Sequence, residues 1–468
     1  MTRQFTKSLW MLMLLAVLVS CPPLTGFQAA RDAAKANIER DFQAAMKAQD
    51  SGDLERAETL LYGLHNAHPG IFAVDESLGM LLVTRGDPTR ALPLLEAAVH
   101  DQPNSDVAHA NLGAALYQLH RNQSALTEFE QAVKIEPGNA SAQQSLGRLY
   151  MENQKPNQAA KALLATLRLK PEDTDLKLDC ITALLAANRT TEARTMLLTI
   201  LDTNRSARAQ SLLGEADEKE GKFQTAAEHF ALAAKLEPSE ENAWLLGLEF
   251  LRHWTFDAAV TEFEAASVMF PDSVRMRLGL GAALFGDAKY VEAVPVFADL
   301  LASEPDNAVY AGLLGISCNS VMQGGSPRCA ALTAYAQTHP GDAKTATYAA
   351  SLLLLRQSEN AQNVELARQL LQHALAADPN LPEAELQMGI VLQNSSNWTD
   401  SIPYLERAIK LKPDFAQAHY RLALAYWRTG RKEDGKVQMD LQKKFARQEE
   451  EDRDRHLRAI TTFVVDVR

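Results

Sequence analysis

The chain has 468 residues, a formal net charge of -12 and a sequence pI near 5.5. Nucleic-acid binding requires a stripe of Lys and Arg that displaces counterions from the phosphates, so the acidic balance argues against DNA or RNA as a partner. Hydrophobic residues make up 46% of the chain, which is typical of a globular protein.

Residues 1–21 have the pattern of a secretory signal peptide. The basic residue Arg3 precedes an apolar run from Leu9 to Val19, which is shorter than the roughly 20 residues that a bilayer-spanning helix needs. The end of the segment resembles the lipobox of bacterial lipoproteins, which implies lipidation at Cys21. We therefore expect an exported protein whose lipid anchor holds it on a bacterial envelope membrane, facing the periplasm. The alternative is conventional cleavage near residues 24–26, which would leave a secreted soluble protein.

Residues 22–37 are expected to hold a linker and the start of the first helix, and from residue 38 to 447 the same residue types recur about every 34 residues. Glycine inside a helix lowers stability by about 1 kcal/mol relative to alanine. Because glycine recurs at the same position of successive repeats, we expect two helix backbones to approach closely there. The recurrent Pro ends a helix, and a following Asn, Asp or Ser caps the next one. The recurring residues are Gly79, Gly113, Gly147, Ala91, Ala125, Ala159, Pro69, Pro103, Pro137 and Pro171, and the expected caps include Ser105, Ser239 and Asp414.

These positions resemble the motif of the tetratricopeptide-repeat (TPR) family, which has a small residue in helix A of each unit, Ala and an aromatic residue or Leu in helix B, and a terminal Pro. The match is close at residues 112–116 and then at Ala125 and Phe129. The resemblance implies an all-α TPR superhelical solenoid of antiparallel helix pairs, with about eleven to twelve units over residues 38–447. Units around 174–206 and 308–380 depart from the motif, and 448–468 is expected to form a charged capping segment and tail.

No motif for catalysis, a cofactor or a metal is present: the chain lacks a phosphate-binding Gly-rich loop, H-E-x-x-H and G-x-S-x-G. The nearest metal pattern is His65-Asn66-Ala67-His68, and two ligands cannot complete a zinc site. The sequence therefore predicts no enzyme, no cofactor and no small-molecule substrate.

We expect a scaffold that binds other proteins during assembly of a bacterial cell-envelope complex. One alternative is a regulatory or substrate-recruiting subunit of an enzyme complex whose active site lies on a partner. Another is a structural spacer without a defined ligand.

Two cysteines lie at similar distances from a turn in the degenerate region. Cys318 and Cys329 flank Gln323-Gly324, which places them on facing helices, where Cα atoms can approach within the roughly 4.4–6.8 Å that a disulfide needs. A disulfide and a pair of reduced core cysteines both fit this placement.

In the TPR family, helix A lines the concave surface at the second, fifth, ninth and twelfth positions of each unit. At these positions the first half of the chain carries more polar residues, with Glu76, Gln144 and Arg148 beside Met80 and Tyr117. The second half is apolar, and we expect it to bind a helix or extended segment of a partner. Its expected groove residues are Trp244, Leu248, Leu278, Phe285, Ile316, Leu386, Ile390, Tyr420 and Trp427.

Overall fold

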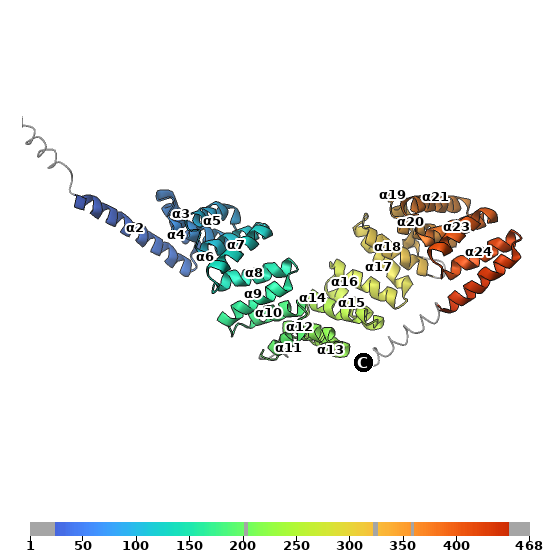
Figure 1. Cartoon of the computed structure of the whole chain (residues 1–468), viewed down its shortest axis with the longest axis horizontal. Coiled ribbons are helices and arrows are strands. Elements are labelled where there is room, and N and C mark those ends of the chain that lie inside the picture. The colour runs from blue at the N-terminus through green and yellow to red at the C-terminus, as the bar shows by residue number, and fades with distance from the viewer. Residues whose placement is uncertain (1–23, 201–204, 322–325, 357–359, 449–468) are drawn as a thin grey trace, which may run out of the picture. The chain divides into compact units, whose positions relative to one another are not determined.

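The computed structural model describes residues 24–200, 205–321, 326–356 and 360–448. Within these ranges the regular structure is entirely helical, and it falls into two compact units, Met1–Met196 and Leu197–Arg468. In each unit antiparallel helices follow one another as stacked pairs (Figure 1). The expected all-α solenoid of helix pairs is confirmed. No helix in the described part of the chain is both long and apolar enough to cross a bilayer.

Helix A has 13 residues and helix B has 14 in most pairs. The helices that begin in the first unit are α2 (Leu24–Asp50), α3 (Leu54–Ala67), α4 (Phe72–Thr84), α5 (Pro88–Asp101), α6 (Asp106–Gln118), α7 (Asn122–Ile135), α8 (Ala140–Glu152), α9 (Pro156–Leu169), α10 (Thr174–Ala186) and α11 (Thr190–Leu197).

In the second unit the even-numbered helices up to α18 are the A helices, and the odd-numbered ones are the B helices. After α18, helix B is split into a 3-10 turn, η2, and a short helix, α19. The elements are α12 (Ala207–Lys219), α13 (Phe223–Leu236), α14 (Glu240–Arg252), α15 (Phe256–Met269), α16 (Val274–Gly286), α17 (Tyr290–Ser303), α18 (Ala308–Ser320), η2 (Pro327–Cys329), α19 (Ala330–Thr338), α20 (Ala343–Arg356), α21 (Ala361–Ala377), α22 (Pro382–Asn394), α23 (Trp398–Leu411), α24 (Ala416–Arg428) and a last helix over 432–448.

Side-chain caps open several of the A helices. The Ser105 hydroxyl accepts a hydrogen bond from the Ala108 amide at 3.2 Å, and Ser239 caps α14 in the same way. These bonds satisfy amides of the first turn that have no partner inside the helix. The expected cap at Asp414 is corrected: the N-cap of α24 is Phe415, which makes no side-chain bond.

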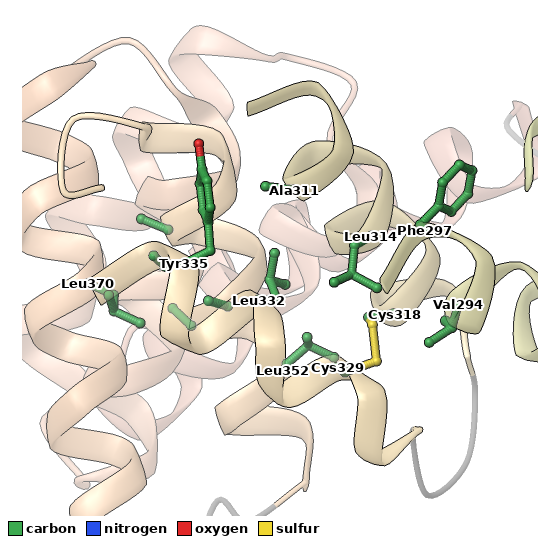
Figure 2. Close-up of a cluster of buried hydrophobic side chains, with 14 of the residues drawn as sticks. Val294, Phe297, Ala311, Leu314, Cys318, Cys329, Leu332, Tyr335, Leu352 and Leu370 are labelled. Carbon is green, nitrogen blue, oxygen red and sulfur yellow. A yellow bond between two sulfur atoms is a disulfide. The ribbon is translucent and has the colours of Figure 1, made fainter. Parts of the chain in front are cut away.

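Most recurrent glycines of helix A make room for a large side chain of helix B, and Gly315 makes room for Tyr348 of the next helix A, α20. A Cβ atom on Gly247 would lie 2.7 Å from Cε1 and Cε2 of Phe263, and one on Gly113 would lie 3.0 Å from the Phe129 ring. The nearest neighbours are therefore side-chain atoms, which corrects our expectation of contact between two backbones. Figure 2 shows one stretch of the resulting core, where Phe297 of α17 packs among the residues of the neighbouring helices.

A residue with left-handed backbone closes most of the turns between helix A and helix B. Gly86 and Gly430 have φ of 79° and 84° there, and Ala288 occupies the same place with φ of 56°. This conformation costs an L-residue roughly 1–2 kcal/mol, whereas glycine adopts it without that cost.

We expect Ala288→Gly to raise the melting temperature, because it removes this strain. Glycine also loses more chain entropy on folding, so the net gain is at most about 1 kcal/mol. The reverse change, Gly86→Ala, should lower the melting temperature, because no atom lies within 4 Å of the added Cβ and only backbone strain changes. Thermal unfolding followed by circular dichroism measures both, and shifts of the same sign would contradict this explanation.

Candidate interaction surface

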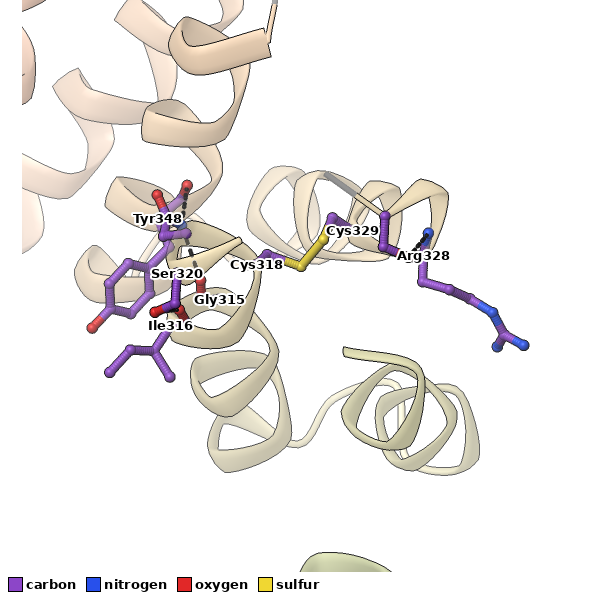
Figure 3. The surroundings of a disulfide bond; sticks show 9 residues. Gly315, Ile316, Cys318, Ser320, Arg328, Cys329 and Tyr348 are labelled. Carbon is purple, nitrogen blue, oxygen red and sulfur yellow. Dashed lines mark hydrogen bonds between the residues drawn. A yellow bond between two sulfur atoms is a disulfide. The ribbon is translucent and has the colours of Figure 1, made fainter. Parts of the chain in front are cut away.

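Several predicted groove residues lie at equivalent repeat positions on three successive A helices in the second unit. Trp244 and Leu248 are on α14, Leu278 and Phe285 are on α16, and Ile316 is on α18. All of them are partly exposed, and Ile316 is 37% exposed. Figure 3 shows Ile316 extending from α18 on the side opposite Cys318. We call these residues the α14–α18 surface.

Trp244 is held in place on this surface. Its ring centroid lies 5.7 Å from that of buried Phe263, and the guanidinium carbon of Arg275 lies 5.3 Å from the Trp244 ring. Arg275 is itself held by Glu241, with Nη1 and Oε2 2.8 Å apart. A cation above an indole face is attracted by the ring quadrupole. The surface therefore combines an ordered aromatic side chain with a charged edge.

Two predicted groove residues do not belong to any open surface. Leu386 and Ile390 are 1% and 6% exposed, and both lie in the core that extends through the second unit. They are on α22, which contacts the A helices α20 and α24 as well as its own helix B, α23. Because α22 contacts α21 as well as these three helices, the side chains that the family motif assigns to the groove are enclosed. The expectation for these two residues is corrected.

The α24 residues are exposed, but one of them has a structural role. Trp427 Nε1 donates a hydrogen bond to the Lys432 carbonyl at 3.3 Å, and its ring lies against Gly435 of the last helix. Trp427 thus holds the last helix onto α24. Tyr420 is also exposed, and it stays a separate surface candidate.

The A helices of the first unit carry polar side chains at the corresponding phase. The Tyr117 hydroxyl donates a hydrogen bond to Glu152 Oε1 at 2.5 Å, and this bond raises the pKa of Tyr117. Asn111 donates to Glu76, whose pKa is raised mainly by burial. A cavity of about 200 Å³ lies beside Tyr117 and is lined by Ala114, Tyr117, Gln118, Phe129, Ser145, Arg148 and Leu149.

Cys318 and Cys329 are joined by a disulfide in the structure, with their Cα atoms 6.0 Å apart. The bond links the last turn of α18 to η2 (Figure 3). Both cysteines are buried in the core shown in Figure 2. The helix that follows η2, α19, is only 9 residues long, so the disulfide joins α18 to an unusually short helix B.

The sequence motifs did not reveal a set of side chains that tie three of the A helices, α6, α8 and α24, to the preceding turn. Nε2 of His109 lies 3.1 Å from the Pro103 carbonyl, and Nε2 of His419 lies 2.9 Å from the Pro413 carbonyl. A carbonyl only accepts, so Nε2 is the protonated nitrogen in each ring. In the sequence, a His or Gln six residues after the terminal Pro of a repeat would have indicated these contacts.

Histidines also pair with acids. Nδ1 of His65 lies 2.6 Å from Oδ1 of Asp75, which is buried, so this histidine of the His65–His68 pattern contacts a carboxylate of the next helix. A second group was missed by the sequence analysis: Nε2 of His253 lies 3.0 Å from Glu218 Oε2 and 3.4 Å from Glu249 Oε1. Burial, followed by the charge of Glu218, raises the pKa of Glu249 to about 8.

Comparison with known proteins gives one family. A profile described as Tetratricopeptide repeat matches residues 77–140, 245–308 and 386–435, and a second profile with this description matches 116–173 and 150–216. Together the matches cover more than half of the chain. No curated protein matches the chain in sequence.

Several solved structures are similar in fold. A tetratricopeptide repeat protein from Parabacteroides merdae is 18% identical, with 53% of this chain and 98% of that chain covered and a TM-score of 0.40. Pseudomonas aeruginosa pilF is 20% identical, with coverages of 46% and 96% and a TM-score of 0.38. The APC/C hetero-tetramer Cut9-Hcn1 gives 14% identity, coverages of 86% and 85%, and a TM-score of 0.38.

Proposed function

Because the chain belongs to the tetratricopeptide-repeat family, we propose that it is a scaffold that binds another protein through the α14–α18 surface. Proteins of this family generally mediate protein–protein interactions, and no catalytic family is indicated. The observation that carries the proposal is the row of partly exposed apolar side chains at one phase of three successive A helices. Contiguous exposed apolar side chains usually mark an interaction site, and aromatic residues supply much of the energy at such sites.

The spacing of the surface constrains what can bind. Packed helices lie about 8–10 Å apart, and α14 contacts α16, so these two A helices present anchors at an interval of roughly 10 Å. An α-helix rises about 1.5 Å per residue and would match this interval with apolar residues about seven positions apart. An extended segment rises about 3.3 Å per residue and would match it about every third residue. We propose a segment of one of these two kinds, with basic or acidic residues that meet Arg275 or Glu241 at the edge.

We further propose that the scaffold acts in assembly of a bacterial cell-envelope complex. The support is the signal-like segment with its lipobox-like end, although residues 1–23, including Cys21, lie outside the described residues. Dual acylation gives stable membrane attachment, at about 0.8 kcal/mol per buried methylene.

Replacing Cys21 with Ser should release the protein from the membrane fraction or leave the precursor unprocessed. The lipid anchor depends on this one sulfur, whereas signal recognition depends mainly on the preceding apolar run. Fractionation with mass spectrometry of the mature N-terminus measures the result, and Cys180→Ser serves as the control. An unmodified mature chain that begins after Cys21 would exclude lipidation.

The binding function is tested by affinity capture of the tagged full chain from a solubilised membrane fraction. We expect one partner in fixed stoichiometry that survives a salt wash, because an apolar contact is not screened by ions. If nothing is retained in fixed stoichiometry, the scaffold proposal fails. Turnover of a substrate by the purified chain alone would instead establish an enzyme.

A further inference from the structure

We propose that Glu218, Glu249 and His253 form a binding site for a divalent transition-metal ion such as Zn²⁺. Glu218 lies at the end of α12, Glu249 lies in the last turn of α14, and His253 directly follows α14. Their nearest ligand atoms all lie within 4.8 Å of one another. Within the described residues no other group of three His, Cys, Asp or Glu side chains meets this condition. The inference is independent of the proposed partner binding.

The distances agree with a metal coordination shell. Zinc holds His nitrogen and carboxylate oxygen at about 2.0–2.2 Å, so tetrahedral ligand atoms are about 3.3–3.6 Å apart. Nε2 of His253 lies 3.4 Å from Glu249 Oε1 and 3.0 Å from Glu218 Oε2. Both distances from the imidazole nitrogen are thus close to those of a tetrahedral shell, and the two carboxylate oxygens lie within 4.8 Å of each other.

The helices present the ligands in a suitable way. Glu249 and His253 are four residues apart, so they project from one side of α14 and its C-cap. The His253 ring lies 3.9 Å from the Phe223 ring, centroid to centroid, and this contact fixes the plane of the imidazole. Glu218 comes from the neighbouring A helix, so a bound ion would link two successive repeats. Three protein ligands leave a fourth position for water or another ligand.

Glu249 is buried in a place that disfavours its ionised form in the absence of a cation. Its side chain is 0% exposed, and Oε1 lies 3.4 Å from Nε2 of His253 without forming a hydrogen bond. An unpaired buried carboxylate is costly, and the nearby carboxylate of Glu218 adds to the cost. A divalent cation between the two carboxylates would neutralise both.

The other histidine–acid contacts differ in composition and supply a control. His109 Nδ1 lies 2.6 Å from Glu128 Oε2, and its Nε2 faces a carbonyl instead of a second carboxylate. That ring contacts a single carboxylate, so the arrangement lacks the second acidic ligand of the proposed site. His109→Gln therefore removes a buried histidine without touching the proposed site.

The test is isothermal titration calorimetry of the full chain with ZnCl₂. We expect one binding event per chain that His253→Gln and Glu218→Gln each weaken by at least about tenfold, because even the loss of a group behind a ligand costs 10–100-fold in metal affinity. His109→Gln should bind zinc as the unaltered chain does. Co²⁺ in place of zinc should give a visible absorption spectrum that the two site variants lose.

A stability measurement gives a second, independent readout. Glu249→Gln should leave the chain folded without metal, because it replaces a buried carboxyl group with a neutral group of similar volume. It should abolish the rise in melting temperature that zinc produces in the unaltered chain. Circular dichroism checks that each variant is folded. The proposal is overturned if the unaltered chain does not bind zinc, or if the site variants bind it as tightly as His109→Gln.

Discussion

Gly247→Ala is expected to lower the stability of the second unit by about 1–3 kcal/mol, although alanine is the better helix former. The added Cβ would meet the ring of Phe263, with Cε1 and Cε2 at 2.7 Å. Phe263 cannot retreat, because a Cβ on Gly279 of the next A helix would lie 2.5 Å from Cε1 of the same ring. The ring is thus enclosed by two glycines, and overpacking must move a helix.

The matched control is Gly312→Ala on α18. Gly312 is also helical, and no atom lies within 4 Å of the Cβ that alanine would add. Relative to glycine, alanine should therefore stabilise this helix by roughly 0.5–1 kcal/mol. The two changes are chemically identical and should shift the melting temperature in opposite directions. Equal shifts in melting temperature would mean that the recurrent glycines of helix A are not required for packing against helix B.

Loss of the Cys318–Cys329 disulfide is expected to destabilise the helix pair of α18 and α19 by about 3 kcal/mol. The sequence separation is 11, and the chain-entropy estimate for a loop of this size is slightly below about 3 kcal/mol. Reduction should lower the melting temperature of the unaltered chain. The Cys318→Ser, Cys329→Ser double variant should melt lower and should not respond to reductant.

Thiol counting under denaturing conditions tests the bond directly. Apart from Cys21, we expect a single titratable thiol, that of Cys180, which is buried in the folded chain. Burial raises the pKa of Cys180 to about 12, so this thiol should not react before unfolding. Three thiols at Cys180, Cys318 and Cys329 would show that the two cysteines are reduced.

The repeat phase predicted the fold because each marker residue has a local physical role. The terminal Pro ends helices, Gly86 closes a turn with positive φ, and Gly247 admits the Phe263 ring. All these requirements recur at one spacing, so a single sequence is enough to reveal them.

The surface was predictable only in part. The family motif indicates toward which side of the repeat a helix A residue points, and Ile316 is exposed as the motif predicts. It does not state how closely neighbouring A helices pack, and so Leu386 and Ile390 were placed on a surface although α20 and α24 contact their helix. The group around Glu249 lay beyond sequence reasoning because Glu218 comes from another repeat, and its distance from Glu249 depends on that packing.

The most direct test of the proposed function is the affinity of the captured partner for a chain with Leu248→Glu and Ile316→Glu. Both side chains are partly exposed, so the fold should survive, and this is checked by circular dichroism. The control is Val291→Glu on α17, which is an exposed apolar residue on a helix B. The account predicts at least about tenfold weaker binding for the double variant and unchanged binding for the control. Unchanged binding by the double variant, or equal loss in the control, would contradict the assignment of the α14–α18 surface.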